Sequence, residues 1–342
     1  MSGCLRVLVA TVLTLAVLAG TTGPGSADEA SHRIVFSFTD DRITESSGLV
    51  DAGSLMFTVN DSGDDPVIYV VDRTTGDTVG VTTYSSVDVS DVEAIAPGPE
   101  VSMPSGTVWV GDIGDNDMDR ASVDLYAVPR PGRGNRDVDA ARFHLVYPDG
   151  SHDAETLLVH PQTGRVYIVS KAILGGIVYA APSSLEPESV NALSAIGYVP
   201  DVVTDGAFFP DGEHVLLRSY GNARVYTFPG LREVGKVELP TQEQGEAVSI
   251  GPAGRIHIST EGEFSDVIRV QLPAGLRASV GGRRDTGPND VLTGDEATGE
   301  SSTSTTTQTS TNGVWVAALV VALVAVGWLL FTVSRRRSRR SS

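Results

Sequence analysis

Five segments of the chain repeat one pattern, and this recurrence limits the possible folds more than any other feature. Each segment joins an acidic residue and small neighbours to an apolar stretch: Glu45-Ser-Ser-Gly-Leu-Val, Val92-Glu-Ala-Ile-Ala-Pro, Asp153-Ala-Glu-Thr-Leu-Leu-Val, Asp205-Gly-Ala-Phe-Phe-Pro and Gly245-Glu-Ala-Val-Ser-Ile. The acidic markers Glu45, Glu93, Glu155, Asp205 and Glu246 are separated by 48, 62, 50 and 41 residues. Such a period is typical of one four-stranded blade of a β-propeller.

The intervals between the markers contain short alternating runs that end at turn residues, as strands do. After the first marker these runs are residues 55–60, 67–72 and 78–84, and after the third they are 165–170, 177–181 and 195–199. Tight turns are expected at Pro-Asp-Gly 210–212 and Pro-Ala-Gly 252–254. No amphipathic helical stretch of useful length is visible, so the sequence predicts an all-β body.

The fifth interval contains three strands and ends near Leu272. A further strand over 34–39, which precedes the first marker, can supply the fourth and so close the ring without leaving an exposed edge. We therefore predict a five-bladed propeller closed by an N-terminal strand. Six blades are the alternative, if the 62-residue interval contains an extra partial blade.

The two ends of the chain predict its compartment. Residues 1–27 have the Arg6, the apolar run and the small residues of a signal peptide, with an N-terminal membrane anchor as the alternative. Residues 314–333 carry no charge, which predicts a transmembrane helix, and the arginine-rich tail 334–342 is expected to be cytoplasmic. Residues 279–313 are polar and rich in Ser and Thr, as in a flexible stalk. We expect a single-pass cell-membrane protein whose propeller, 28–278, is extracytoplasmic.

Charge and cysteine content narrow the function classes. The chain has 25 basic and 43 acidic residues, a net charge of −18, and this excess of negative charge excludes nucleic acid as a partner. Its single cysteine, Cys4, lies in the leader. The exported domain therefore cannot form an internal disulfide, and its own core must stabilise it.

The innermost strand of every propeller blade begins on the same face, so the marker residues should converge at the central channel. The expected ring contains Ser47 (or Ser46), Glu93, Glu155, Asp205 and Glu246. Four carboxylates about 7 Å apart would repel one another by about 10–15 kcal/mol, and a calcium ion, which accepts six to eight oxygen ligands, would relieve this repulsion. The alternatives are solvated turn formers or caps for strand-end amides.

A second set of polar residues follows the second strand of each blade and should reach the same face. It contains Asn60, Asp61, Asp112, Asp115, Asn116, Lys171, Arg218, Tyr220 and Glu261. The Asp- and Asn-rich segments are either plain loops or a second cation site. Lys171 and Arg218 either neutralise Glu155 and Asp205 or bind an anionic group of a ligand.

Several of these motifs resemble a family of bacterial exported, membrane-anchored β-propellers without an assigned biochemical role. The matching pieces are Glu45-Ser-Ser-Gly-Leu, Asn60-Asp-Ser-Gly, Gly111-Asp-Ile-Gly-Asp-Asn, Asp153-Ala-Glu-Thr-Leu-Leu and Arg218-Ser-Tyr. The ring is also loosely similar to that of the calcium-activated apyrases, five-bladed propellers with a central calcium. That similarity implies a hydroxyl residue where this chain has Asp205, so it supports a ring but not nucleotide hydrolysis.

Three functions fit these features. The first is a calcium-stabilised module that binds a small anionic ligand or a protein partner. The second is a metal-dependent hydrolase of a phosphoester or lactone, with Glu155, Lys171 and Arg218 as catalytic candidates. The third is a glycosidase, although Tyr220 and Trp109 are the obvious aromatic residues for a sugar to stack on. We favour the binding module, because no nucleophile or general base stands out.

Overall fold

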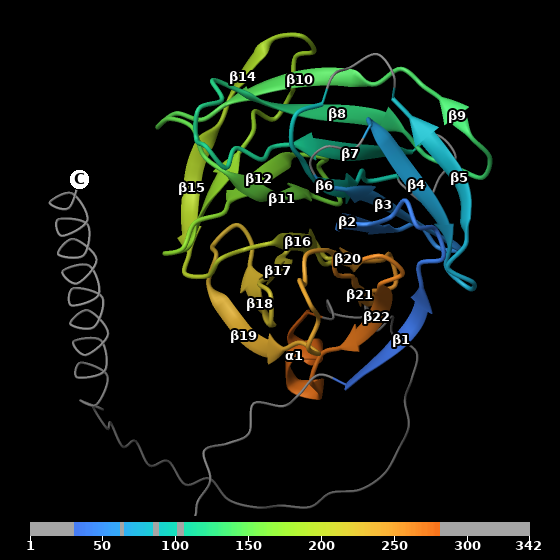
Figure 1. The fold of residues 1–342 in the computed structure, drawn as a ribbon. Helices are drawn as coiled ribbons and strands as arrows, with labels where there is room; N and C mark the ends of the chain where they lie inside the picture. Colours follow the sequence, from blue (N-terminus) through green and yellow to red (C-terminus); the bar gives the residue numbers. More distant parts are fainter. Residues whose placement is uncertain (1–30, 62–64, 85–88, 101–105, 281–342) are drawn as a thin grey trace, which may run out of the picture. The chain divides into compact units, whose positions relative to one another are not determined.

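The computed structural model describes residues 31–61, 65–84, 89–100 and 106–280. In this part of the chain the strands form five sheets, each built mainly of antiparallel strands, and the sheets are arranged around a common centre (Figure 1). The five innermost strands contact one another in a closed ring. The all-β propeller with five blades is thus confirmed.

The blades follow one another along the chain. Blade 1 contains β2 (Ser46–Asp51), β3 (Leu55–Asn60), β4 (Val67–Asp72), β5 (Thr78–Thr83) and β9 (Arg136–Asp137). Blade 2 contains β6 (Val92–Pro97), β7 (Thr107–Asp112), β8 (Val123–Pro129), β10 (Ala141–Val146) and β14 (Val190–Ala192). Blade 3 contains β11 (Ala154–Val159), β12 (Val166–Ser170), β13 (Gly176–Ala180) and β15 (Ser194–Val199). Blade 4 contains β16 (Asp205–Phe208), β17 (His214–Arg218), β18 (Asn222–Thr227) and β19 (Glu233–Glu238).

Blade 5 joins the two ends of the described chain. It contains β20 (Val248–Ile250), β21 (Ile256–Ile258), β22 (Asp266–Gln271) and, as its outer strand, β1 (Ser31–Ser37). Strands β1 and β22 pair in antiparallel fashion from Ser31↔Gln271 to Ser37↔Asp266. The closure by an N-terminal strand is confirmed, and it pairs an edge that would otherwise be open to other chains.

The six-bladed alternative is wrong. The long interval between the second and third markers contains the outer strands of blade 2 and the two-residue strand β9, which crosses to blade 1 and pairs in parallel with β5. The additional residues therefore extend an existing sheet instead of forming a further blade.

Apolar side chains fill the spaces between neighbouring blades, so the propeller has five cores. Leu49, Met56, Phe36 and Phe38, for example, pack together between blades 1 and 5. The other four clusters lie between blades 1 and 2, 2 and 3, 3 and 4, and 4 and 5. Because each sheet buries both of its faces against other blades, the inner strands read as apolar runs with few polar positions.

The turns and the helix complete the domain. Gly212 and Gly254 end the two predicted Pro-x-Gly turns with φ of +68° and +67°, a conformation that glycine adopts without strain. The sequence analysis missed one helix, α1 (Ala274–Val280), whose Val280 is buried in the core between blades 4 and 5. The described chain therefore continues as packed structure two residues beyond 278.

Among the described residues, no helix has the length and apolarity that a membrane span requires. The predicted signal peptide 1–27, transmembrane helix 314–333 and tail 334–342 lie outside the described residues, as does the stalk from residue 281 onward.

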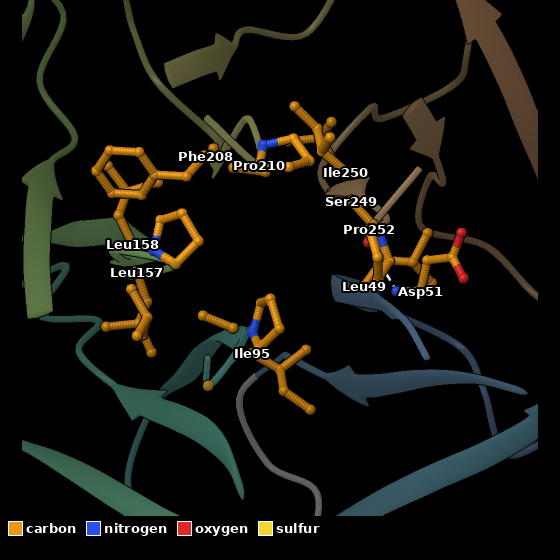
Figure 2. A pocket seen from close by; sticks show the side chains of 18 of the residues that line it. Leu49, Asp51, Ile95, Leu157, Leu158, Phe208, Pro210, Ser249, Ile250 and Pro252 are labelled. Carbon is orange, nitrogen blue, oxygen red and sulfur yellow. Dashed lines mark hydrogen bonds between the residues drawn. The ribbon is translucent and has the colours of Figure 1, made fainter. Parts of the chain in front are cut away.

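The inner strands all begin at one end of the central channel, which we call the acidic end, and finish at the other, the apolar end. At the apolar end a cavity of about 270 Å³ is lined by residues of all five inner strands and by prolines such as Pro210 and Pro252 (Figure 2). Leu49, Ile95 and Leu157 occupy equivalent positions in this wall. The ionisable markers lie at the acidic end.

Candidate metal centre at the acidic end of the channel

Three of the inner strands carry the same irregularity next to the marker position. The pairing shifts between Ser46 and Gly48 in β2, between Val92 and Ala94 in β6, and between Ala154 and Thr156 in β11. The extra residue in each bulge is Ser47, Glu93 or Glu155. A bulge changes the direction of a side chain relative to a regular strand, so the backbone presents the side chain in the same way at these three positions.

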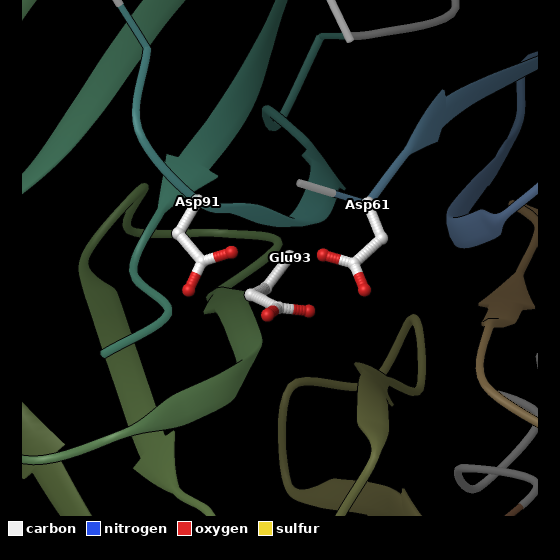
Figure 3. Close-up of side chains that lie close together, drawn as sticks. All are labelled: Asp61, Asp91 and Glu93. Carbon is white, nitrogen blue, oxygen red and sulfur yellow. The ribbon is translucent and has the colours of Figure 1, made fainter. Parts of the chain in front are cut away.

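Three carboxylates from two neighbouring blades meet at this end: Asp61, Asp91 and Glu93. Each offers an oxygen atom, and these atoms lie within 4.8 Å of one another. Asp61 directly follows β3 in blade 1, whereas Asp91 precedes β6 and Glu93 lies within it. The carboxylates point toward one another in Figure 3. We call them the acidic triad.

Backbone contacts hold the segment that carries Asp91. The carboxylate of Asp112 accepts hydrogen bonds from the Ser90 and Asp91 amides, both at 3.0 Å, and pairs with Arg120 at 2.8 Å. The Gly114 amide donates to the carbonyl of Asp91 at 3.2 Å. A Cβ at Gly114 would press on the Asp91 carboxylate and lie 2.7 Å from Glu93 Oε1. Glycine at this position therefore leaves room for the triad.

Burial and the repulsion of neighbouring carboxylates raise the pKa values of Glu93 and Asp91. The pKa of Glu93 is raised to about 10, first by burial and then by the charges of Asp61, Asp91 and Asp153. The pKa of Asp91 is also raised, by burial and by the same kind of repulsion. Without a counter-ion, Glu93 is therefore protonated at neutral pH.

The donor set fits a hard divalent cation. It consists of carboxylate oxygens, partly shielded from water, two of which lie close against Gly114, a residue without a side chain. Calcium accepts such oxygen ligands in a flexible geometry, and no thiolate or imidazole favours a softer metal. The coarser part of the prediction, an acidic cluster at this face that could hold a divalent cation, agrees with the structure. The identity of the ion stays a prediction.

The structure places the five predicted ring residues in different environments. Of these five, the acidic triad includes Glu93. The hydroxyl of Ser47 donates to the carbonyl of Glu93 at 2.5 Å and so ties blade 1 to blade 2. Glu155 is 7% exposed and forms an ion pair with Lys171, while its Oε2 has no hydrogen-bond partner among the described residues.

Asp205 departs from the ring register. Asp205 pairs directly with Arg218 in β16 and β17 without a bulge, so the residue that corresponds to Glu155 is its neighbour Thr204. The Asp205 carboxylate accepts hydrogen bonds from the Gly206 and Val248 amides, both at 2.7 Å. Burial raises its pKa well above the ordinary value. Asp205 thus links blades 4 and 5, and the hydroxyl expected from the apyrase-like pattern lies one residue earlier.

The two predicted cations behave differently. Lys171 pairs with Glu155, as expected of a counter-charge, and lies 5.9 Å from the ring centroid of Tyr220. Burial alone would lower its pKa, but Tyr220, Glu246 and Glu93 raise it. Lys171 therefore stays charged at the channel.

Arg218 is the strand-register partner of Asp205 but forms no ion pair with it, and its side chain instead joins blades 4 and 5. It is fully buried, and its guanidinium donates to the carbonyls of Ala247 and Ser259, at 2.5 and 2.8 Å, and to Gln242. Burial lowers its pKa to about 10, so it remains charged at neutral pH. This environment gives Arg218 a structural role.

Glu246 and Glu261 complete the acidic end in blade 5. The pKa of Glu246 is raised to about 7, mainly by burial and against the opposing charge of Lys171. Burial also raises the pKa of Glu261, whose Oε1 accepts a hydrogen bond from Gln244 at 2.7 Å. Glu246 therefore changes its charge near neutral pH.

The remaining candidates form hydrogen bonds within loops, are exposed to solvent or pack within a blade. Asn60 donates to the carbonyl of Arg42 at 2.7 Å, and Asp115 accepts hydrogen bonds from the Asp119 and Arg120 amides. Asn116 is exposed. Trp109 packs on Phe143 within blade 2 instead of lining the channel face, so the sugar-stacking surface of a glycosidase loses one of its two aromatics.

Sequence reasoning missed Asp91 and Gly114. One signal could have found Asp91, because an acidic residue recurs two positions before the bulge in three blades, as Glu45, Asp91 and Asp153. Gly114 gives no such signal, since its closeness to Glu93 depends on how the loop after β7 folds back.

Comparisons with known proteins assign no family to the chain. No family model and no curated protein matches the chain. Among solved structures, the chain is similar to a gluconolactonase from Xanthomonas campestris, with 14% sequence identity and a TM-score of 0.42, over 72% of this chain and 91% of that one. A similarity at this level carries no argument about the reaction.

Proposed function

We propose that the protein is a divalent-cation-dependent binding module that holds a small anionic ligand at the acidic end of its channel. The observation that carries this proposal is the acidic triad, whose three carboxylate oxygens lie within 4.8 Å of one another. Calcium is the ion that suits it best, because the donors are all oxygens and come from loops and a bulge of two different blades.

Two neighbouring groups support an anionic ligand. Lys171 is charged and its side chain is 23% exposed, and Tyr220 beside it is 43% exposed. A ligand with a carboxylate or phosphate group would complete the coordination of the cation and also contact the ammonium group of Lys171. Most other ionisable groups at this end are acidic and would repel such a ligand if the cation were absent.

Calcium titration of the full chain tests the cation site. We expect calcium to raise the melting temperature and a chelator to lower it. Calcium at 100 times its Kd should raise the free energy of unfolding by about 2.7 kcal/mol. Glu93→Gln, which removes one ligand charge at constant size, should weaken calcium binding at least tenfold in isothermal titration calorimetry. The matched control is Glu213→Gln at an exposed turn, which should bind like the wild type. Equal calcium affinity in wild type and Glu93→Gln would exclude the triad as the site.

A metal-dependent hydrolase is the second candidate, and one observation favours it. Glu246 has a pKa near 7, so it can accept a proton from water at neutral pH, as a general base must. A screen of lactones and phosphoesters, with and without calcium, separates the two functions. Turnover that Glu246→Gln abolishes without loss of calcium binding supports the hydrolase. Calcium binding without turnover of any compound supports the binding module.

We also propose that the propeller is tethered to the outer side of the cell membrane by the predicted helix 314–333. Protease treatment of intact cells tests this topology. A shielded C-terminal tag and a cleaved propeller are expected, whereas a shielded propeller would contradict the orientation.

A further inference from the structure

A second cavity lies on the opposite end of the molecule, where the four-stranded sheet of blade 5 meets a turn of blade 1. Its volume is about 340 Å³, and four of its lining residues are Arg33, Arg73, Arg255 and Arg269. His257 also lines this cavity. We call it the arginine pocket. Four arginines in one cavity are unexpected in a chain with a net charge of −18.

The register of blade 5 aligns several of these groups. Ser249 pairs with His257, His257 with Arg269, and Arg269 with Arg33, so one row crosses all four strands. Arg255 directly precedes β21 and lies two residues before His257, so the strand alternation directs it to the same side. Arginines directly opposite each other on neighbouring strands repel, so the Arg33–Arg269 pair destabilises the sheet in the absence of an anion.

One carboxylate faces the arginine pocket. Asp51, whose side chain is fully buried, lies 3.4 Å from Arg73 and 3.5 Å from Arg255. Within the described residues, Arg33 and Arg269 make no ion pair. Burial, together with the neighbouring arginines, lowers the pKa of His257 to about 4 against the effect of Asp51, so the imidazole is neutral. Four guanidinium groups and one carboxylate leave three uncompensated positive charges.

Buried nitrogen atoms in the wall also lack partners. His257 is 2% exposed, and its Nδ1, 3.5 Å from Asp51 Oδ2, makes no hydrogen bond in the described structure. The Nε atoms of Arg255 and Arg269 are likewise buried without a hydrogen-bond acceptor. Unsatisfied buried donors are costly, and a ligand with several acceptor oxygens would satisfy them.

We propose that the arginine pocket binds the phosphate group of a small molecule. A phosphate monoester carries about 1.5 to 2 negative charges at pH 7 and three acceptor oxygens, which matches an excess of three positive charges better than a single carboxylate does. The planar forks of several arginines bind phosphate oxygens in pairs. This site is separate from the acidic triad and does not depend on the function proposed above.

Calorimetric titration of the full chain tests the proposal, with a chelator present and with ionic strength held constant by sodium chloride. The probes are inorganic phosphate, phenyl phosphate and benzoate. We expect saturable binding of the phosphates and at least tenfold weaker binding of benzoate. Tighter binding of phenyl phosphate than of inorganic phosphate identifies an organic phosphate as the ligand, and equal binding identifies the free ion. Benzoate binding as tight as that of phenyl phosphate overturns the proposal.

Arg269→Gln and Arg33→Gln locate the site. Each should weaken phosphate binding at least tenfold, and neither should lower the melting temperature of the ligand-free protein, because each removes a like-charge contact. The matched control is Arg232→Gln, at an exposed turn of blade 4, which should bind phosphate like the wild type. Glu93→Gln should also leave phosphate binding unchanged. Unaltered phosphate affinity in both pocket variants would show that any binding occurs elsewhere.

Discussion

At the scale of single residues, equivalent backbone positions have different chemistry. Ser47, Glu93 and Glu155 occupy the same bulge in three blades, yet one donates to a neighbouring carbonyl, one joins the acidic triad and one pairs with Lys171. The backbone sets the direction of each side chain, and the nearest partner then sets its role. Asp91 enters the triad because Asp112 fixes the backbone that carries it.

Substitution of Gly114 tests how closely the loop after β7 approaches the triad. In Gly114→Ala the new methyl group would lie 2.7 Å from Glu93 Oε1 and against Asp91, so the carboxylates must move apart. We expect calcium affinity to fall at least tenfold, with a loss of about 1–3 kcal/mol in stability. Calorimetry with calcium measures the first effect and urea unfolding the second. Gly221→Ala is the control, because its Cβ would meet no atom within 4 Å. Unchanged calcium affinity in Gly114→Ala would contradict the described approach of the loop.

Glu246 should make the stability of the metal-free protein depend on pH. Its pKa in the folded protein is about 7, above the ordinary value of 4.5. Its contribution to the free energy of unfolding is therefore fully present below pH 4.5 and is lost as the pH rises toward 7. The maximal loss is about 3 kcal/mol. Glu246→Gln should remove this loss. The free energy of unfolding of the wild type should therefore fall relative to that of the variant as the pH rises from 4.5 to 7. Urea unfolding in chelator at several pH values measures it. Parallel pH profiles would show that Glu246 titrates normally.

At the scale of elements, blade 5 is the joint of the ring. Its three inner strands come from the end of the described chain and its outer strand, β1, from the beginning. The core between blades 5 and 1 contains Phe36 and Phe38 from this N-terminal segment. No disulfide is available in the body, so backbone pairing and this core hold the joint closed.

Truncation of Phe36 measures the contribution of the joint. Phe36 is 6% exposed, whereas Ile34 on the same strand is 57% exposed. We expect Phe36→Ala to lower the free energy of unfolding by about 3–5 kcal/mol and Ile34→Ala to lower it by less than about 1 kcal/mol. Chemical denaturation followed by circular dichroism makes the comparison. Similar small losses in both variants would show that β1 contributes little to the closed ring.

At the scale of the described propeller, charge is distributed unevenly. The acidic triad, Glu246 and Glu261 gather where the inner strands begin, and the arginine pocket lies where they end. The excess of acidic residues elsewhere leaves a large net negative charge, which favours solubility but repels itself in the compact state.

Salt should therefore stabilise the metal-free protein. An increase in sodium chloride from about 0.01 M to about 0.15 M shortens the screening length from about 30 Å to about 8 Å. We expect a gain on the order of 1 kcal/mol, or a rise of about 2–4 °C in Tm. Scanning calorimetry in chelator and without phosphate measures it. A constant or falling Tm would mean that attractive ion pairs outweigh the net repulsion.

The strands of the propeller could be predicted because their signals are local. Residues 55–60 and 67–72 were expected as strands and are β3 and β4, and the two Pro-x-Gly turns lie where expected. Helix α1 was missed because seven residues give too weak a periodic signal. The extra strand β9 was missed because its partner lies in another blade.

The candidate site was only partly predictable. Glu93 and Asp61 were expected at the channel, but in separate sets. Asp205 was assigned to the ring position that Thr204 occupies, because blade 4 lacks the bulge of blades 1, 2 and 3. Neighbouring backbone amides hold Asp112, Asp115 and Asp205, although their side chains belong to the same chemical class as the triad. Sequence alone does not separate acids that bind amides from acids that face one another.

The amino-acid sequence by itself predicted the propeller, with five blades favoured over six, and the strand that closes it, because turn residues and apolar alternation act over a few neighbouring positions. Only the tertiary structure decided which charged groups meet, both in the acidic triad and in the arginine pocket. The physical reason is that these groups come from different blades. Their distances depend on bulges, strand register and loop contacts that arise only once the ring has closed.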